Sequence, residues 1–444
     1  MIASCRASLV SPREGIQRFA MENKARNKGY VHYNHTDPCR YERWTARESY
    51  EFMHTRPWQE VVDFYSNSVN GRASILSALF GIETHRVHND AEILEVSDKI
   101  ELESVSAEDR TGRWARLTFK IVLSYHGGSF DGWQKQPGLN TVQGVIERSL
   151  AKFVDERKVQ LLKDKGLPVE GSVVVAGRTD KGVTALQQVC AFSSWRKDIK
   201  PRDIEEAING AVPRNLIVGS VSEVSRSFHP NFSAKWRHYF YILPFNDWEG
   251  GEQGSESGQD AENLRCNENT DEQRIGCDEC NVGTVEDLIN DYKDDHENGK
   301  KRRTFSIIRV NQLLQQLEGK LLSYKMFARD TKASRNVGPP TQCFVYHARA
   351  AEARLPCSDH GEGRKVMCVE LVANRFLRKM VRVLVATSVR EAAAGADEDA
   401  LIKLMDATCR RATAPPAPPD GLCLVDVGYA EFDSQYCLIP KDRV

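Results

Sequence analysis

A regular series of strand-like and helix-like segments begins at residue 117 and limits the possible folds more than any other feature of the chain. Leu117, Phe119, Ile121 and Leu123 are apolar at every second position, which is typical of a half-buried strand. The series then runs helix, strand, strand, helix, strand, strand, at residues 141–155, 172–176, 188–192, 203–212, 216–224 and 235–243. Short connections between strands favour an α+β domain with a largely antiparallel sheet and helices on one face.

The same kind of pattern returns later in the chain. Its expected elements are a helix, two strands, two helices and a closing strand, at residues 305–317, 342–351, 364–372, 377–394, 397–409 and 422–429. Gly395 follows the second of these helices directly, which is a typical C-terminal stop. We therefore expect an α+β fold of two similar halves, joined through a mixed, largely antiparallel sheet around a central basic cleft.

An acidic stretch separates the two halves and hides the charge of the rest of the chain. Residues 246–300 hold 17 Asp and Glu against 4 Lys and Arg, whereas the whole chain has a net charge of −1. The remaining residues therefore carry a net charge of +12. The stretch is too polar to offset the entropy of ordering, so we expect a disordered insert that either mimics RNA or is an inert tether. The basic remainder suggests a polyanionic partner such as RNA, with a merely solvated basic surface as the alternative.

Composition excludes several classes of protein. No window approaches ~20 uninterrupted apolar residues, so no membrane partner is expected. The 12 Cys in 444 residues are too sparse for a disulfide scaffold, which favours free thiols in a reducing compartment. Cys277 and Cys280 form a single CxxC pair, which by itself is weak evidence for a metal site. The basic, Ser-containing first 30 residues fit either an organelle transit peptide or a plain terminus, which leaves a chloroplast or mitochondrion and the cytoplasm or nucleus open.

Residues 31–115 form an aromatic-rich, polar extension in which we identify no chemistry. Residues 57–65 read as a helix opened by Pro57, and a second short helix is expected at residues 72–80. We interpret the extension as a segment that packs on the main domain or docks a partner.

The strongest local motif is Ala-Gly-Arg-Thr-Asp-Lys-Gly-Val at residues 176–183. It places Asp180 at the end of an apolar strand, on a loop whose flanking glycines allow close approach of a ligand. Arg178 and Lys181 stand beside Asp180 and would keep its carboxylate ionised. From the residues alone, a catalytic aspartate and a turn with a structural ion pair both remain possible.

Two further segments suit a polyanion. Along the expected strand at 235–243, Arg237, Tyr239 and Tyr241 share one face, which favours base stacking beside phosphate or an aromatic-covered sheet face. At the start of the expected helix 377–394, Arg378 and Arg382 lie four residues apart and share a face, either for a phosphate contact or for solvation.

Taken together, six segments resemble, in order, the TruA-type tRNA pseudouridine synthase family. They span residues 125–134, 141–143, 177–183, 228–241, 376–382 and 413–425, so the resemblance covers about 120 to 429 apart from the insert. It implies a pseudouridine synthase fold and the isomerisation of uridine to pseudouridine in the anticodon stem-loop of tRNA. It also implies a homodimer that needs no metal or nucleotide cofactor. A non-catalytic RNA-binding or RNA-chaperone protein on the same fold is the alternative.

The resemblance also implies roles for individual residues. Asp180 matches the catalytic aspartate, Tyr239 the tyrosine against the target base, and Arg382 the arginine that pairs with the aspartate. Arg178 matches the arginine linked to base flipping and Leu422 the apolar residue beside the base. Candidate phosphate contacts are Lys181, Lys235, Arg237, Arg378 and Lys379. The chain departs from the family pattern at His126, Thr184, Asn231 and Ser323.

The expected organisation of the chain has six parts. They are a disordered or transit-like terminus (1–30), a partly helical extension (31–115), an N-terminal half with the Asp180 loop (116–245), an acidic disordered insert (246–303), a C-terminal half (304–432) and a tail (433–444).

Overall fold

The computed structural model describes residues 39–71, 75–80, 116–246, 301–329, 340–356, 363–407 and 409–440. The expectations for residues 1–30, for the cysteine pair 277/280 and for nearly all of the acidic insert lie outside these ranges. In the described part of the chain, no helix combines the length and the apolar character that a membrane crossing requires.

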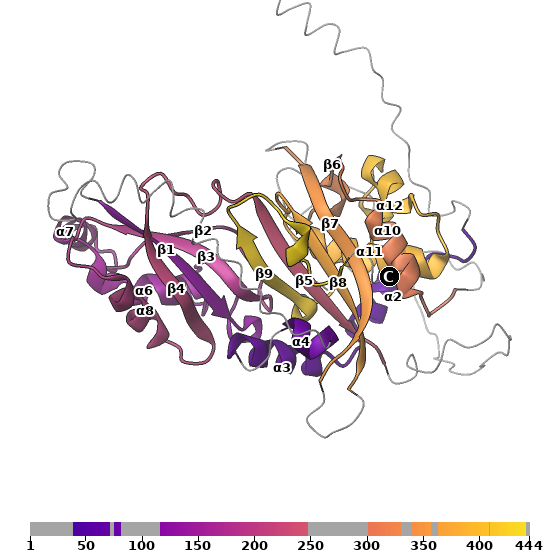
Figure 1. The fold of residues 1–444 in the computed structure, drawn as a ribbon, viewed down its shortest axis with the longest axis horizontal. Helices are drawn as coiled ribbons and strands as arrows, with labels where there is room; N and C mark the ends of the chain where they lie inside the picture. Colours follow the sequence, from indigo (N-terminus) through magenta and orange to yellow (C-terminus); the bar gives the residue numbers. More distant parts are fainter. Residues whose placement is uncertain are drawn as a thin grey trace, which may run out of the picture.

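The described strands form one nine-stranded sheet that runs along the length of the molecule (Figure 1). Its order is β4 (Leu216–Val224), β1 (Leu117–Tyr125), β3 (Thr184–Ser194), β9 (Leu422–Gly428), β5 (Trp236–Pro244), β8 (Lys365–Ala373), β7 (Gln342–Arg354) and β6 (Leu321–Ser323), with β2 (Val173–Val175) paired to β3. The β3–β9 pair is parallel and the other pairs are antiparallel. The mixed, largely antiparallel α+β fold expected from the sequence is therefore confirmed.

The two halves of the sheet meet at the parallel pair. Thr184 lies opposite Cys423 and Ala185 opposite Leu424, directly after the Asp180 loop. Strand β5 precedes the acidic insert in the chain, yet it pairs with β9 and β8 in the second half of the sheet. The division of the sheet thus does not follow the chain boundary at residue 245. As a result, the Asp180 loop, the start of β9 and the middle of β5 come together at the centre of the molecule.

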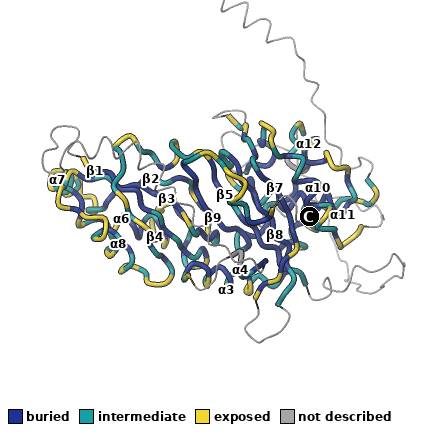
Figure 2. Tube along the Cα trace, in the orientation of Figure 1, coloured by how far each residue is buried: buried dark blue, intermediate teal, exposed yellow. Residues whose placement is uncertain are grey.

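Helices at either end of the sheet cover its hydrophobic residues (Figures 1 and 2). Helices α6 (Val142–Ser149) and α8 (Pro201–Asn209) bury Ile146, Ile204 and Ile208 in a core shared with β1, β3 and β4. Helices α10 (Ile307–Gln315) and α11 (Met380–Ala394) form a second core with β7 and β8. Helix α11 is buried along nearly its whole length and ends at Gly395, whose φ of +65° fits the expected stop.

The N-terminal extension contributes three helices, α2 (Ala46–His54), α3 (Trp58–Val69) and α4 (Ile75–Phe80). Helix α3 begins one residue after Pro57, as the sequence predicts, and buries Val61 and Phe64 in a third core that also contains Phe240. Helix α2 was not expected, although its Thr45–Glu48 capping box could have indicated it.

Two expected helices differ from the structure. The helix at 141–155 ends early: α6 stops at Ser149, and a new helix, α7 (Glu156–Asp164), starts because the Asp155 side chain caps the Lys158 N–H. The helix expected at 397–409 is reduced to α12 (Ala400–Lys403) and a 3₁₀ turn at Leu404–Asp406. The chain turns extended at Ala407, directly after Asp406, which has a low helix propensity.

Candidate active site

The loop that carries Asp180 connects β2 to β3, and hydrogen bonds fix its backbone on both sides. Gln188 donates to the carbonyl of Gly177 at 2.7 Å, and the hydroxyls of Tyr125 and Thr179 are 2.7 Å apart. The Val183 N–H donates to the Asp180 carbonyl at 3.2 Å. The position of the Asp180 backbone is therefore set by the sheet beneath it and not by the loop alone.

Glycines let neighbouring loops approach this loop closely. Gly182 has a φ of +84°, and a Cβ at that position would lie 2.9 Å from Cγ of Pro419. A Cβ on Gly127 would lie 2.3 Å from the Gly182 carbonyl oxygen. Side chains at these positions would push apart the segments that form the site.

The Asp180 carboxylate faces two arginines from the start of α11. Nη1 of Arg382 is 3.3 Å from Oδ2, and Nε of Arg378 is 3.9 Å from Oδ1. The Asp180 side chain is 28% exposed, so a substrate can still reach it. The two neighbours in the loop do not pair with Asp180: Lys181 pairs with Asp131 at 2.9 Å, and the Arg178 side chain is exposed.

Arg382 is itself held firmly. Its side chain is 12% exposed, and Nε donates to the carbonyl of Ala417 at 2.6 Å. The Ala417 N–H in turn donates to the Arg382 carbonyl at 3.1 Å. Arg382 therefore joins the start of α11, the proline-rich loop 413–421 and the Asp180 loop.

Tyr239 lies on β5 beside the same loop. Its ring packs edge-on against Phe376 with centroids 5.1 Å apart, and a Cβ on Gly177 would lie 4.0 Å from its hydroxyl. Burial raises the pKa of Tyr239 to about 12, with Arg237 opposing the rise and Asp180 adding to it. The hydroxyl thus stays protonated at neutral pH, and no hydrogen bond joins it to another described residue. Leu422 is buried at the start of β9, opposite Tyr241 of β5.

Arg237 is not placed as a phosphate contact, contrary to expectation. Its side chain is buried, and its guanidinium donates to the carbonyl oxygens of Ala234, Ala176, Asn231 and Asn374 and to the side chain of Asn231. Because acceptors from three segments already surround it, Arg237 ties the loop after β2 to β5 and to the turn after β8. Lys235, by contrast, is exposed and pairs with Glu431 at 3.4 Å.

A cavity of about 510 Å³ opens next to Asp180. Lys181, Gly182 and Arg382 line it from the Asp180 side. Helix α2 also lines it, with Arg47, Tyr50 and His54. The described part of the extension thus packs on the main domain, which is one of the two interpretations from the sequence, and it also contributes residues to the wall of this cavity. The aromatic pair Tyr50 and His54, at i and i+4 behind the capping box, is the sequence pattern that could have revealed this.

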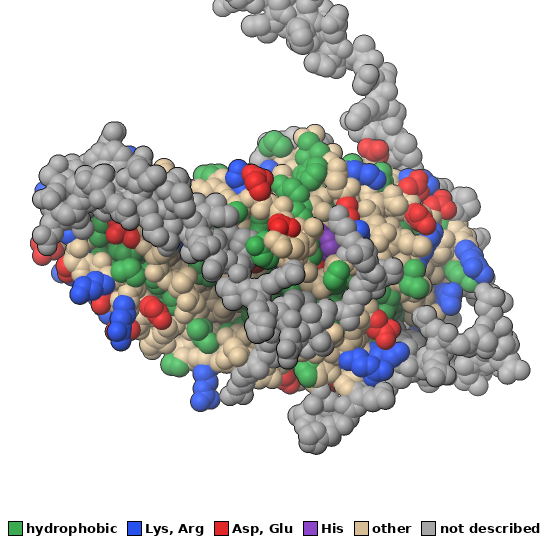
Figure 3. Space-filling view, viewed as in Figure 1, with side chains coloured by type: hydrophobic (Ala, Val, Ile, Leu, Met, Phe, Trp, Pro, Cys, Tyr) green, Lys and Arg blue, Asp and Glu red, His purple; other side chains and the backbone are tan. Residues whose placement is uncertain are grey.

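Basic side chains outnumber acidic ones around this cavity. Arg47, Lys181, Lys379 and Arg382 line it together with Asp420. The outer face drawn in Figure 3 differs, because basic and acidic side chains are intermixed on its described part. The cavity lining is therefore more basic than the described part of the face drawn in Figure 3.

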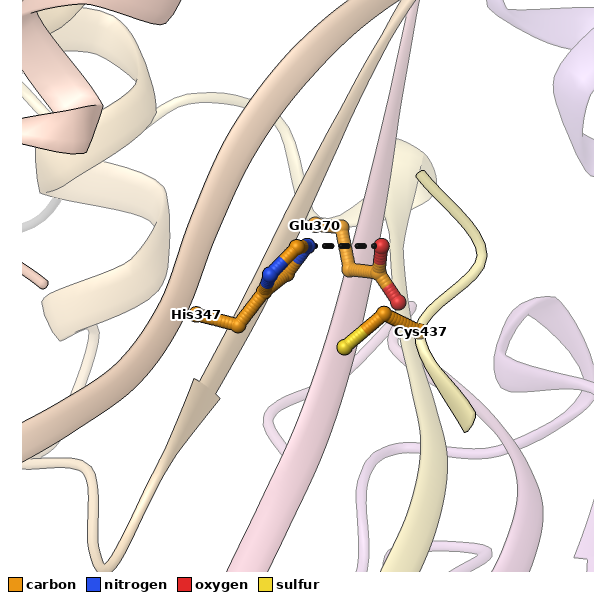
Figure 4. A group of neighbouring side chains, drawn as sticks. All are labelled: His347, Glu370 and Cys437. Atoms are coloured by element: carbon orange, nitrogen blue, oxygen red, sulfur yellow. Dashed lines mark hydrogen bonds and ion pairs between the residues drawn. The ribbon is translucent and has the colours of Figure 1, made fainter. Parts of the chain in front are cut away.

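A second group of polar residues, His347, Glu370 and Cys437, is close enough to hold a metal ion (Figure 4). Its carboxylate is already saturated, however. Oε1 of Glu370 lies 2.7 Å from Nε2 of His238 and accepts from the Leu438 N–H, while Oε2 accepts from His347 and from the Ile439 N–H. Burial alone would raise the pKa of Glu370, but the attraction of His238 and the hydrogen bonds from both histidines lower it to about 2. We interpret this group as the attachment of the C-terminal segment to the sheet.

The mixed sheet and the central Asp180 loop agree with the pseudouridine synthase fold. The chain belongs to the tRNA pseudouridine synthase family, since the model of that family matches residues 121–233 and 292–430, more than half of the chain.

Individual relatives agree with this assignment. A tRNA pseudouridine synthase A from Thermosipho melanesiensis is 37% identical over 129 residues, which is 29% of this chain and 48% of the relative. One from Synechocystis sp. is 35% identical over 128 residues, 29% of this chain and 42% of the relative. In these matches the chain spans about half the length of the relative or less. One from Pelodictyon phaeoclathratiforme is 27% identical over 311 residues, 70% of this chain and 98% of the relative.

Proposed function

We propose that this protein isomerises uridine to pseudouridine in tRNA, in the anticodon stem-loop, with Asp180 as the nucleophile. The observation that carries the proposal is the placement of the Asp180 carboxylate, 3.3 Å from Arg382 and on the loop that Tyr239 also faces. The names of the relatives, each a tRNA pseudouridine synthase A, support the tRNA substrate.

The reaction breaks the bond between N1 of uracil and C1′ of ribose and forms a bond between C5 and C1′. C5 loses its proton and N1 gains one, so no oxidant, reductant or energy source is consumed. An ionised Asp180 can attack either C1′ of the ribose or C6 of the base, and both routes fit the site. Arg382 holds the carboxylate in place for either attack, because its own position is fixed by Ala417.

The remaining residues have distinct proposed roles. The ring of Tyr239 lies against the base, and its hydroxyl helps to remove the proton from C5. The exposed Arg178 fills the stack after the target nucleotide has left it. Lys181 and Arg378, both exposed, contact phosphates, and Leu422 closes the apolar side of the site.

The test is a map of pseudouridine by carbodiimide labelling of unmodified tRNA, treated with wild-type protein or with Asp180→Asn. Wild-type protein is expected to give new reverse-transcription stops in the anticodon arm. Asp180→Asn is expected to give none, while its dissociation constant for tRNA stays within about twofold of the wild-type value. Tight binding without stops from wild-type protein would instead favour the alternative, a non-catalytic RNA-binding protein. A homodimer belongs to the same proposal and is tested by sedimentation equilibrium.

A further inference from the structure

The N-terminal extension presents a pair of stacked rings to the cavity beside Asp180. The rings of Tyr50 and His54 lie 3.7 Å apart between centroids with an interplanar angle of 18°. Both residues line the same cavity as Arg382 and Lys181. The family match begins at residue 121, so this wall of the cavity lies outside the part of the chain that the family model covers.

The extension is anchored well enough to serve as a fixed wall. Buried Arg56 donates to the Pro244 carbonyl at 2.9 Å, and Arg43 forms a 2.8 Å ion pair with buried Glu391 of α11. The Tyr65 hydroxyl donates to the carbonyl of Gly421 at 3.0 Å. Helices α2 and α3 are therefore tied to the same loop and helix that position Arg382.

The hydrogen bonding of His54 leaves one nitrogen available. Its Nδ1 is 2.9 Å from the Tyr50 carbonyl, which can only accept, so Nδ1 carries the hydrogen. Burial lowers the pKa of His54 and Arg382 lowers it further, against smaller opposing effects of the hydrogen bond to Tyr50 and of Asp420, which favours the neutral ring. Nε2 is then an acceptor, and no hydrogen bond joins it to another described residue.

These observations fit an unpaired nucleotide. Single-stranded RNA is held by stacking of bases on aromatic rings, next to basic groups that contact phosphate. Nε2 of His54 can accept from a base N–H or from a ribose 2′-hydroxyl. Arg47, whose side chain is 69% exposed, lies on the same helix and supplies positive charge at the rim.

We propose that Tyr50 and His54 of helix α2 bind the nucleotide next to the reacting uridine and so determine which RNA site the protein uses. The proposal rests on the proposed function, because it takes the uridine at Asp180 as its reference point. Asp180 itself does not line the cavity, whereas Lys181, Gly182 and Arg382 do. Within this proposal we therefore assign the cavity to the neighbouring nucleotide.

The experiment measures Tyr50→Leu, His54→Leu and Arg47→Glu in the full chain. Dissociation constants for unmodified tRNA are measured with each variant combined with Asp180→Asn. The values of kcat and KM are measured with Asp180 intact. Loss of a base–aromatic contact is expected to raise both the dissociation constant and KM about fivefold or more, with kcat within about twofold. Arg47→Glu changes an exposed side chain and removes only a surface ion pair with Glu51, so it keeps the test valid if the ring variants unfold. It is expected to weaken binding and to reduce the salt dependence of binding.

Gln59→Ala is the matched control, because Gln59 is exposed on α3 and does not line the cavity. Dissociation constants and KM values within about twofold of this control, for all three variants, would overturn the proposal. If wild-type protein forms pseudouridine in that case, the proposed function stands and only the subsite fails. If instead the variants weaken tRNA binding while wild-type protein forms no pseudouridine, the two rings contact RNA, but the proposed reaction fails and with it their place next to a reacting uridine.

Discussion

At the scale of single residues, the site depends on side chains whose surroundings assign them separate tasks. Arg382 and Arg237 are both arginines beside the central loop, but Arg237 is surrounded by carbonyl oxygens and Arg382 faces a carboxylate. Thr184 and Asn231, two of the residues at which the chain departs from the family pattern, also form hydrogen bonds here. The Thr184 hydroxyl accepts from the Gly127 N–H, and the Asn231 side chain accepts from Arg237. These two departures therefore maintain the shape of the site.

Tyr239→Phe separates the ring of Tyr239 from its hydroxyl. Because no hydrogen bond joins the hydroxyl to another described residue, the variant is expected to keep its melting temperature and its affinity for tRNA. If the hydroxyl moves the C5 proton, kcat falls about 10²- to 10⁴-fold. Single-turnover kinetics with saturating protein measure this directly. An unchanged kcat would mean that Tyr239 acts through its ring alone.

At the scale of elements, the site is built where the Asp180 loop, the loop at Gly127 and the proline-rich loop 413–421 pack against one another. A Cβ on Gly182 of the Asp180 loop would lie 2.9 Å from Pro419 of the proline-rich loop. In that loop the Pro418 carbonyl accepts from the Tyr241 hydroxyl, and the Gly421 carbonyl accepts from the Tyr65 hydroxyl. Tyr65 belongs to the extension and Tyr241 to β5, so elements far apart in the chain fix one loop. Small changes at their contacts should therefore reach Asp180.

Gly182→Ala tests this coupling, and Gly138→Ala is its control. Both glycines have a positive φ, +84° and +75°, so alanine strains the backbone at either position by about 1 kcal/mol. Only at Gly182 does the new Cβ also meet a neighbour, since nothing lies within 4 Å of the one at Gly138. Chemical denaturation is expected to show a larger loss of unfolding free energy for Gly182→Ala than for Gly138→Ala. Gly182→Ala is also expected to lower kcat, whereas Gly138→Ala is not. Equal kcat values for the two variants would contradict the coupling.

At the scale of the whole molecule, the C-terminal segment is attached to the long sheet through one buried carboxylate. Glu370 of β8 accepts the N–H groups of Leu438 and Ile439 and contacts His238 of β5 and His347 of β7. One buried carboxylate thus links three strands to the end of the described chain.

The pKa of Glu370 predicts how stability depends on pH. The folded pKa of about 2 lies below the ordinary value of 4.5, so Glu370 contributes stability above pH 4.5 that is lost as the pH falls towards 2. The shift corresponds to about 3 kcal/mol. Glu370→Gln is therefore expected to unfold more easily than wild type at pH 7, with the difference shrinking between pH 4.5 and pH 2. Urea unfolding at several pH values measures it, and a difference that does not change with pH would contradict this assignment.

The sequence alone determined the order of most helices and strands, the α+β class and the loop that carries Asp180. Those features depend on local rules: alternation of apolar residues, helix caps, and glycines where the chain turns. Helix α7 and the shortened helix α12 escaped prediction because a cap at Asp155 and a break after Asp406 outweighed the longer pattern.

Tertiary structure alone decided how distant residues meet. Asp180 and Arg382 are 202 residues apart in the chain, and the parallel pairing of β3 with β9 and the packing of α11 bring them together. The burial of Arg237 was invisible in the sequence, and the i, i+4 spacing of Tyr50 and His54 did not indicate which cavity they would line. The physical reason is that periodicity reports which face of a segment is buried, whereas the partner on that face is set by packing across the whole molecule.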